Sequence, residues 1–263
     1  MRKNWGVSNN NAAPPISVQL YSLREECGVD FPGVLRQLGE AGFVGVELAG
    51  FHGLAPAELA KIANDCGLRF SSAHMGLLES GAQAGSLDDL AAMGCDTAIV
   101  PFLPPDDFND AAVVEAHATS INTMAALGRE RGIRVGYHNH FWEFDRQLGG
   151  VTAWHYLFDR LDPDVFAEID LYWAVLSGLD VPAFLAEQGA RIKYLHVKDG
   201  GAQEPQAPMV AVGSGSMPIA SLLADASFAE WHVVELDRCA TDMMTAVVDS
   251  HRFLIGAGLS SGR

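Results

Sequence analysis

The sequence predicts an α/β protein built as one (β/α)8 TIM barrel, and three observations support this fold. Apolar, β-rich runs alternate with helical patterns along the whole chain, which places parallel strands side by side. The chain has 263 residues, and a single barrel of this type needs about 250 residues. Polar clusters close most of the predicted strands, as they do where barrel strands deliver side chains to one shared mouth.

The predicted strands are short apolar runs that end in polar residues. They cover residues 16–23, 44–48, 69–75, 96–102, 134–140, 165–170, 192–199 and 231–237. A doubly wound open sheet is the alternative arrangement. No G-x-G-x-x-G pattern follows the first strand, and polar clusters recur at many strand ends, whereas an open sheet gathers its ligand at one switch point. The barrel is therefore favoured.

A helical pattern follows each predicted strand. The predicted helices cover residues 31–42, 55–67, 86–94, 110–131, 151–161, 172–189, 217–226 and 240–258. Gly67 and Gly132 stand at the ends of the second and fourth helices, where glycine commonly caps a helix. The helical stretch after the sixth strand is interrupted near Gly178 and Pro182.

Composition and charge exclude several classes of function. The formal net charge is -16, and the 17 Lys and Arg residues form no basic run, so nucleic acid and anionic membranes would be repelled. No apolar run approaches the ~18 residues that span a bilayer. Residues 1–15 lack the apolar stretch of a signal peptide and are expected to form a disordered or extended arm before a barrel of residues 16–263. We therefore expect a cytoplasmic protein with a small-molecule partner.

Ionisable side chains at the strand ends form the candidate site. Glu143, Asp170, His196 and Glu235 offer three carboxylates and one imidazole. Such a set suits a divalent metal such as Mn²⁺, Mg²⁺, Co²⁺ or Zn²⁺. A bound cation would also offset the cost of burying several charges in one barrel mouth. Other polar candidates at strand ends are Glu47, His74, His138, His140 and Lys198.

The segment GSGS at residues 213–216 precedes a predicted helix, which invites an anion-binding interpretation. The pattern is too short to be specific.

Four segments carry a resemblance to a known family. They read YHNHFWEF from Tyr137, EIDLYWAVLSGLDVPAFLAEQGARIKYLHVKDG from Glu168, VGSGSMPIASLL from Val212 and VVELD from Val233. From about Ile16 onward the chain resembles the sugar phosphate isomerase/epimerase family, with its xylose isomerase-like TIM barrel. The Y-H-N-H-x-x-E-F signature is similar to a branch that includes keto-sugar isomerases, inosose-dehydratase-like proteins and proteins acting on 3-keto-glycosides. These relatives share strand ends and differ in loops, so the resemblance does not select a substrate.

The resemblance implies a metal held by the fifth to eighth strands. Asp170, His196 and Glu235 match the family's ligands, and Glu143 is the favoured fourth ligand. In the ketose-epimerase branch a glutamate stands inside the fifth strand, where this chain has His138. His138 or His140 is therefore the alternative ligand.

The resemblance also implies a sugar or polyol substrate and, because barrels of this family often pair, a homo-oligomer. The expected catalytic residues are Glu235, His140 and Glu143. The expected substrate-binding residues are His74, Glu47, His138, His140, Lys198 and Trp173.

The expected activity is that of an isomerase or epimerase, which removes a proton beside a metal-polarised carbonyl and passes through an enediolate. A dehydratase or deglycosidase acting on an inosose or 3-keto-glycoside is the alternative, because it would share the first half of the reaction. A related abasic-site nuclease is disfavoured by the acidic charge balance. A carbohydrate-binding barrel without metal is a further alternative.

Overall fold

The computed structural model describes residues 13–76 and 82–263. Most of the predicted arm, residues 1–12, lies outside the described residues. Its last described part pairs with the C-terminal segment, because Pro15 forms a parallel bridge with Ser261. The proposed division into an arm of residues 1–15 and a barrel of residues 16–263 stays a prediction.

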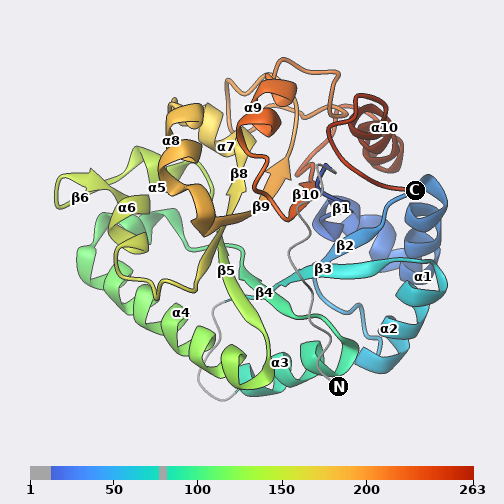
Figure 1. Ribbon diagram of the computed structural model, residues 1–263, viewed down its shortest axis with the longest axis horizontal. Helices are drawn as coiled ribbons and strands as arrows, with labels where there is room; N and C mark the ends of the chain where they lie inside the picture. The colour runs from blue at the N-terminus through green and yellow to red at the C-terminus, as the bar shows by residue number, and fades with distance from the viewer. Residues whose placement is uncertain (1–12, 77–81) are drawn as a thin grey trace.

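Eight parallel strands form a nearly closed barrel, which confirms the predicted fold and excludes the open sheet (Figure 1). Their order is β1-β10-β9-β8-β5-β4-β3-β2. A bridge between Gln19 and Glu47 brings the two edge strands, β1 and β2, together. The strands are β1 (Ile16–Val18), β2 (Gly45–Leu48), β3 (Arg69–His74), β4 (Thr97–Val100), β5 (Arg134–His138), β8 (Phe166–Asp170), β9 (Ile192–Val197) and β10 (Trp231–Val234).

The helices surround the strands (Figure 1). They are α1 (Arg24–Ala41), α2 (Pro56–Asp65), α3 (Ala82–Met93), α4 (Ala111–Arg131), α5 (Trp142–Asp145), α6 (Ala153–Phe158), α7 (Leu171–Leu176), α8 (Val181–Gln188), α9 (Ile219–Asp225) and α10 (Met243–Gly256). None of the described helices is both long and apolar enough to span a membrane. Helix α4 ends at the predicted cap, Gly132, which takes a left-handed φ of 73°, and begins after Asp110, whose side chain accepts from the Ala112 amide.

The chain differs from the predicted elements where side chains bond to the backbone. Strand β1 ends at Val18, because Gln19 accepts the Tyr21 amide at 2.9 Å and starts a 3-10 turn, η1 (Leu20–Leu23). Helix α1 begins before the predicted residue 31, with a kink at Asp30, whose carboxylate accepts the Gly33 amide at 2.9 Å. Strand β5 ends early at His138.

A helix and a hairpin that were not predicted lie between β5 and α6, and the hairpin includes the first two residues of the predicted helix 151–161. Helix α5 follows β5, and a small hairpin of β6 (Gln147–Leu148) and β7 (Val151–Thr152) follows α5.

The barrel interior changes from apolar to polar along the strands. Phe166, Tyr194 and Trp231 pack together near the strand starts. Side chains two residues apart on a strand share a face, so polar residues follow the same face toward the carboxyl ends. A Cβ atom at Gly45 or Gly136 would lie 2.6 Å from the rings of Trp231 or Phe166. These two glycines therefore leave space for the three rings of Phe166, Tyr194 and Trp231, which form an apolar plug. The polar site lies between this plug and the carboxyl ends of the strands.

His232 of β10 provides a test of barrel stability against pH. This buried ring contacts the Ser260 hydroxyl at 2.8 Å, and burial lowers its pKa to about 4. The pKa of His232 in the folded protein lies below its usual value of about 6.5. The contribution of this neutral ring to the unfolding free energy is therefore fully present above pH 6.5. It is lost as the pH falls from 6.5 toward the folded pKa, because the unfolded chain takes up a proton first. We expect His232→Gln to remove about 2 kcal/mol of the decrease in unfolding free energy between pH 7.5 and pH 5. Urea unfolding of both proteins at the two pH values measures this difference, and an equal decrease in both would contradict it.

Candidate metal centre

A pocket of about 430 Å³ opens at the carboxyl ends of the barrel strands. Pockets of this size are typical of small-molecule sites. Its lining combines titratable and aromatic side chains from several strand ends. The lining residues are Tyr21, Ala49, His74, Pro101, Phe102, His138, His140, Glu235 and Asp237.

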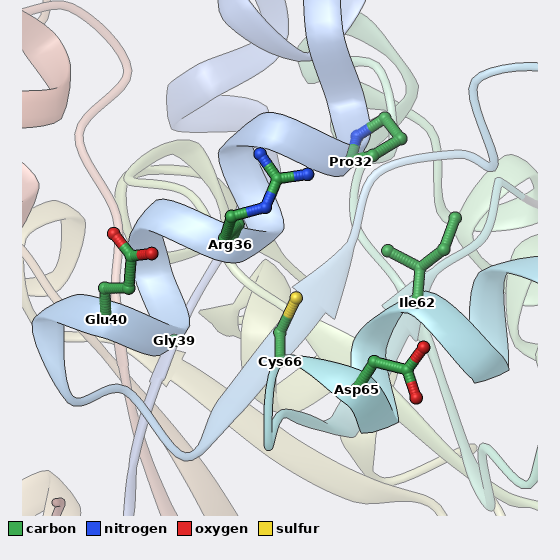
Figure 2. A pocket seen from close by; sticks show the side chains of 7 residues that line it. All are labelled: Pro32, Arg36, Gly39, Glu40, Ile62, Asp65 and Cys66. Atoms are coloured by element: carbon green, nitrogen blue, oxygen red, sulfur yellow. The ribbon is translucent and has the colours of Figure 1, made fainter.

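A second hollow of about 480 Å³ lies between α1 and α2 on the outside of the barrel (Figure 2). Figure 2 shows Arg36 and Glu40 on α1 and Cys66 and Asp65 at the end of α2. The lining includes no histidine, and Asp65 is already paired with Lys61 at 2.5 Å. The strand-end pocket is therefore the candidate site.

Four side chains from consecutive strands of the barrel form the candidate metal set. They are His138 of β5, Asp170 of β8, His196 of β9 and Glu235, which follows β10, and their ligand atoms all lie within 4.8 Å of one another. Within this set, His196 Nδ1 lies 2.8 Å from Glu235 Oε2. The structure thus brings three of the predicted ligands together with His138, the alternative ligand expected from the fifth strand.

Glu143, the favoured fourth ligand, is not brought to this set. Its Oε1 accepts the Tyr137 hydroxyl at 2.7 Å, and its Oε2 accepts the His140 amide at 2.9 Å. Tyr137 and His138 are adjacent on β5 and so point to opposite faces of the strand. Because Glu143 is anchored to the face that carries Tyr137, it lies behind the strand, away from the barrel interior. Burial raises the pKa of Glu143 to about 8.

Lys198 supplies a buried positive charge beside the metal set. Its ammonium lies 2.9 Å from Asp170 Oδ2, 2.7 Å from Glu235 Oε2 and 2.7 Å from Asp237 Oδ2. Although burial alone would raise the pKa of Glu235, Lys198 and His196 hold it below its usual range. Burial raises the pKa of Asp170 to about 6, against the opposing effect of Lys198. Asp237 was not among the predicted site residues, although it lies two residues after Glu235.

Two further carboxylates lie deeper in the barrel, and both are fully buried. Glu47 Oε1 is 2.7 Å from His196 Nε2 and 3.0 Å from His74 Nε2, and it also accepts the Gln19 side-chain amide at 2.7 Å. Glu168 Oε2 is 3.0 Å from His74 Nε2 and 3.1 Å from His196 Nε2. Glu47, predicted to contact substrate, therefore lies beneath the pocket rather than in its lining.

Glu168 was missed by the sequence analysis. The available signal was its position two residues before Asp170, which places both carboxylates on the inner face of β8. Burial and the nearby Glu47 raise the pKa of Glu168.

The pocket walls carry the remaining predicted residues. Burial would lower the pKa of His74, but Glu47 and Glu168 raise it to about 9. Burial and Lys198 lower the pKa of His140 to about 3, and this ring stacks on Trp142 with ring centres 4.3 Å apart. Trp173 is buried behind the wall, with its ring 5.2 Å from the Lys198 ammonium. The structure thus places His74 and His140 at the pocket surface, with Lys198 and Trp173 behind it.

The residues present fit a divalent metal. Two imidazoles and two carboxylates are a common donor set for Zn²⁺, Mn²⁺ and related ions. Two buried polar atoms of the set, His138 Nδ1 and Asp170 Oδ2, make no hydrogen bond within the described residues. The Lys198 ammonium lies 2.9 Å from Asp170 Oδ2 and supplies an ion pair there, so the fit to a divalent ion rests on the chemistry of the converging donor set.

The GSGS segment closes around an anion supplied by the chain itself. The Asp199 carboxylate accepts the amides of Gly200, Gly213, Gly215 and Met217 at 2.8–3.0 Å. These amides are therefore already occupied, which argues against the anion-binding interpretation.

Asp199 is accordingly expected to act in stability rather than in ligand binding. Charge-assisted hydrogen bonds contribute about 1.5–3 kcal/mol each, and Asp199→Asn leaves one neutral acceptor among four amides. We expect this variant to lose about 3 kcal/mol of unfolding free energy, measured by urea denaturation. A loss below about 0.5 kcal/mol, the size of an ordinary surface substitution, would show that these bonds do not hold the loop.

Several solved structures resemble this chain over most of its length. A sugar phosphate isomerase/epimerase from Parabacteroides distasonis is 24% identical, with a TM-score of 0.80 over 99% of this chain and 100% of that chain. A probable 3-DHS dehydratase from Bacillus anthracis is 14% identical, with a TM-score of 0.73 over 92% and 98% of the two chains. A D-allulose 3-epimerase from Methylomonas sp. is 12% identical, with a TM-score of 0.69 over 93% and 98%. At these identities the likeness shows the fold alone.

A search of curated protein sequences found no significant match. The sequence model of one family, described as a xylose isomerase-like TIM barrel, matches residues 82–255, which is more than half of the chain. Together with the barrel of parallel strands, this match shows that the chain belongs to the xylose isomerase-like TIM barrel family.

Proposed function

We propose that the protein is a divalent-metal-dependent isomerase or epimerase acting on a keto-sugar or polyol. One observation carries the proposal: two imidazoles and two carboxylates converge at the ends of four consecutive strands. The pocket beside them is lined by two members of the set, His138 and Glu235. A small molecule in the pocket would therefore meet the metal set directly.

The residues proposed to hold the ion are His138, Asp170, His196 and Glu235. When bound, a divalent ion supplies Lewis-acid polarisation of a carbonyl, which makes the neighbouring C–H more acidic. The predicted candidates for this ion are Mn²⁺, Mg²⁺, Co²⁺ and Zn²⁺.

Glu235 and His140 are the residues proposed to move the proton. Glu235 lines the pocket and is held ionised by Lys198 and His196. His140 also lines the pocket, and its low pKa keeps the imidazole neutral at pH 7. A carboxylate and a neutral imidazole can each accept a proton and return it. Glu143, the third predicted catalytic residue, is held behind β5 and takes no part in this proposal.

His74 is proposed to bind a substrate oxygen. Its Nε2 faces the carboxylates of Glu47 and Glu168, so Nδ1 is the ring nitrogen left for the pocket. With a pKa of about 9 the ring is protonated at pH 7, and it can donate a hydrogen bond from Nδ1.

The same protonated ring supports the alternative function, a lyase or hydrolase acting on an inosose or 3-keto-glycoside. Elimination needs a proton donor at the leaving oxygen, and His74 is a cationic donor that lines the pocket. Product analysis separates the two functions, because an isomer or epimer keeps the substrate's mass whereas elimination releases water or an aglycone.

Other expectations stay predictions. They are the cytoplasmic location, the possible homo-oligomer, and the lack of nucleic-acid and membrane partners.

The proposed ligand set predicts opposite results for two buried carboxylates. Asp170→Asn should weaken Mn²⁺ binding by more than the roughly 10–100-fold that loss of an outer partner costs. Glu143→Gln should change it by less than about threefold, well below that range, because its oxygens bind Tyr137 and the His140 amide. Isothermal titration of the metal-free proteins measures both affinities. Loss of binding in Glu143→Gln would return Glu143 to the ligand set.

The proposed proton transfer predicts exchange of a substrate C–H with solvent. In D₂O with saturating Mn²⁺, the wild-type protein should incorporate deuterium beside the carbonyl of its ketose substrate, detected by mass spectrometry across a ketose panel. His140→Gln should slow exchange by about 10²-fold or more while keeping its Mn²⁺ affinity, because His140 is outside the metal set. Glu235→Gln should lose exchange as well. Full exchange in either variant would remove that residue from the proton-transfer role.

A further inference from the structure

Asp237 is an acidic residue of the pocket that lies outside the metal set. It lines the pocket together with Glu235, which stands two residues earlier in the chain. The side chain of Asp237 is 19% exposed, whereas that of Glu235 is 5% exposed. Because Asp237 is not a member of the metal set, its carboxylate is the acidic group of the lining that is left for a substrate.

Contacts through both the side chain and the backbone fix the position of Asp237. Its Oδ2 accepts a hydrogen bond from the Lys198 ammonium at 2.7 Å. Its backbone carbonyl accepts a hydrogen bond from Arg24 at 3.1 Å, and Arg24 also donates to the Tyr21 carbonyl at 2.8 Å. The Arg24 guanidinium lies 4.4 Å from the centre of the Tyr21 ring. One arginine therefore holds two pocket-lining residues, Asp237 and Tyr21, together.

Lys198 has no hydrogen left for a substrate. An ammonium group carries three N–H donors, and oxygens of Asp170, Glu235 and Asp237 lie 2.7–2.9 Å from Nζ of Lys198. Among the described residues that line the pocket, none is a lysine or an arginine. This part of the lining therefore offers no free ammonium or guanidinium to a phosphate or carboxylate, and an anion beside Asp237 would be repelled.

The second oxygen of Asp237 is suited to a hydroxyl group. An ionised carboxylate only accepts hydrogen bonds, and it does so through both oxygens. Lys198 occupies Oδ2, whereas Oδ1 has no hydrogen-bond partner within the described residues. The neighbouring Tyr21 is 46% exposed and adds an aromatic surface to the same lining. A hydroxyl donor on a carbon framework matches this pair of side chains.

We propose that Asp237 is a specificity-determining residue whose carboxylate accepts a hydrogen bond from a substrate hydroxyl. The substrate is then a sugar or polyol with no phosphate or carboxylate on the carbon that faces Asp237. Lys198 Nζ lies 2.7 Å from both Asp237 Oδ2 and Glu235 Oε2, so this carbon lies close to the metal set. The inference rests on the proposed function, because it takes the substrate to be a sugar bound in this pocket.

The test compares Asp237→Ala and Asp237→Asn with the wild type on a panel of ketohexoses, each with its deoxy and phosphorylated analogues. The full chain is loaded with Mn²⁺, and mass spectrometry gives kcat/KM for exchange of a substrate C–H in D₂O. Isothermal titration with Mn²⁺ examines the metal set, and circular dichroism with urea unfolding examines folding. Glu25→Gln is the matched control, because it removes the same charge from an exposed residue of α1 outside the pocket lining.

In the wild type, removal of one particular hydroxyl should lower kcat/KM about 10–100-fold, the range for a hydrogen bond to a charged group. Phosphorylation of the same hydroxyl should abolish exchange. In Asp237→Ala, that deoxy analogue should match its parent ketose within about twofold, because the partner is gone.

Asp237→Asn keeps a neutral acceptor, so its loss with the deoxy analogue should be smaller than in the wild type, and it carries the test if Asp237→Ala does not fold. It should also recover exchange with the phosphorylated analogue, because the repelling charge is gone. Both variants should keep the Mn²⁺ affinity of the wild type. Glu25→Gln should keep the full wild-type loss with the deoxy analogue.

Two results would overturn the role of Asp237. One is an equal loss with every deoxy analogue in the wild type and in both Asp237 variants. The other is a fall of about tenfold or more in Mn²⁺ affinity in both variants, because Asp237 would then act on the metal set.

A wild-type protein that exchanges no ketose would instead contradict the proposed function. Saturation-transfer NMR of the same panel with the Mg²⁺-loaded protein would then test Asp237 through binding alone. A loss of binding with one deoxy analogue that disappears in Asp237→Ala would support its role. Absence of binding by every member of the panel would overturn it.

Discussion

The charge balance of four buried carboxylates is the constraint on which the site depends. Glu47, Glu168, Asp170 and Glu235 stand inside one barrel, almost out of reach of water. Charges in such surroundings must be paired or bind a cation, because the loss of hydration is large. The chain supplies His74, His196 and Lys198 among these carboxylates. The roles proposed for the site depend on which carboxylates these cations pair with.

The apolar half of the barrel confines these charged side chains to the end of the barrel where the pocket opens. Phe166, Tyr194 and Trp231 fill the interior near the strand starts, and glycines at 45 and 136 leave space for the rings. Above this plug the polar residues form two layers. Glu47 and Glu168 hold imidazole nitrogens from below, and Asp170 and Glu235 face the pocket side. The upper layer includes Glu235, which lines the pocket.

Sequence reasoning identified the strand ends well and the strand interiors poorly. Asp170, His196 and Glu235 follow from polar residues closing apolar strands, and the structure brings them together. Glu143 was expected at the same mouth, but the chain turns into α5 after β5 and anchors it to Tyr137. Glu168 was overlooked because an acidic residue within a strand gives no local sign of its partners, which come from strands distant in the sequence.

The sequence by itself determined the barrel and most of its polar mouth. Alternation of strands and helices selects the fold, and a period of two along each strand selects the inner face. Only the tertiary structure decided which polar atoms meet. The inner side of β5 carries His138 rather than Glu143, and both ring nitrogens of His196 face carboxylates from different strands. These contacts depend on strand register and on where a strand gives way to a helix, which are set by long-range packing rather than by neighbouring residues.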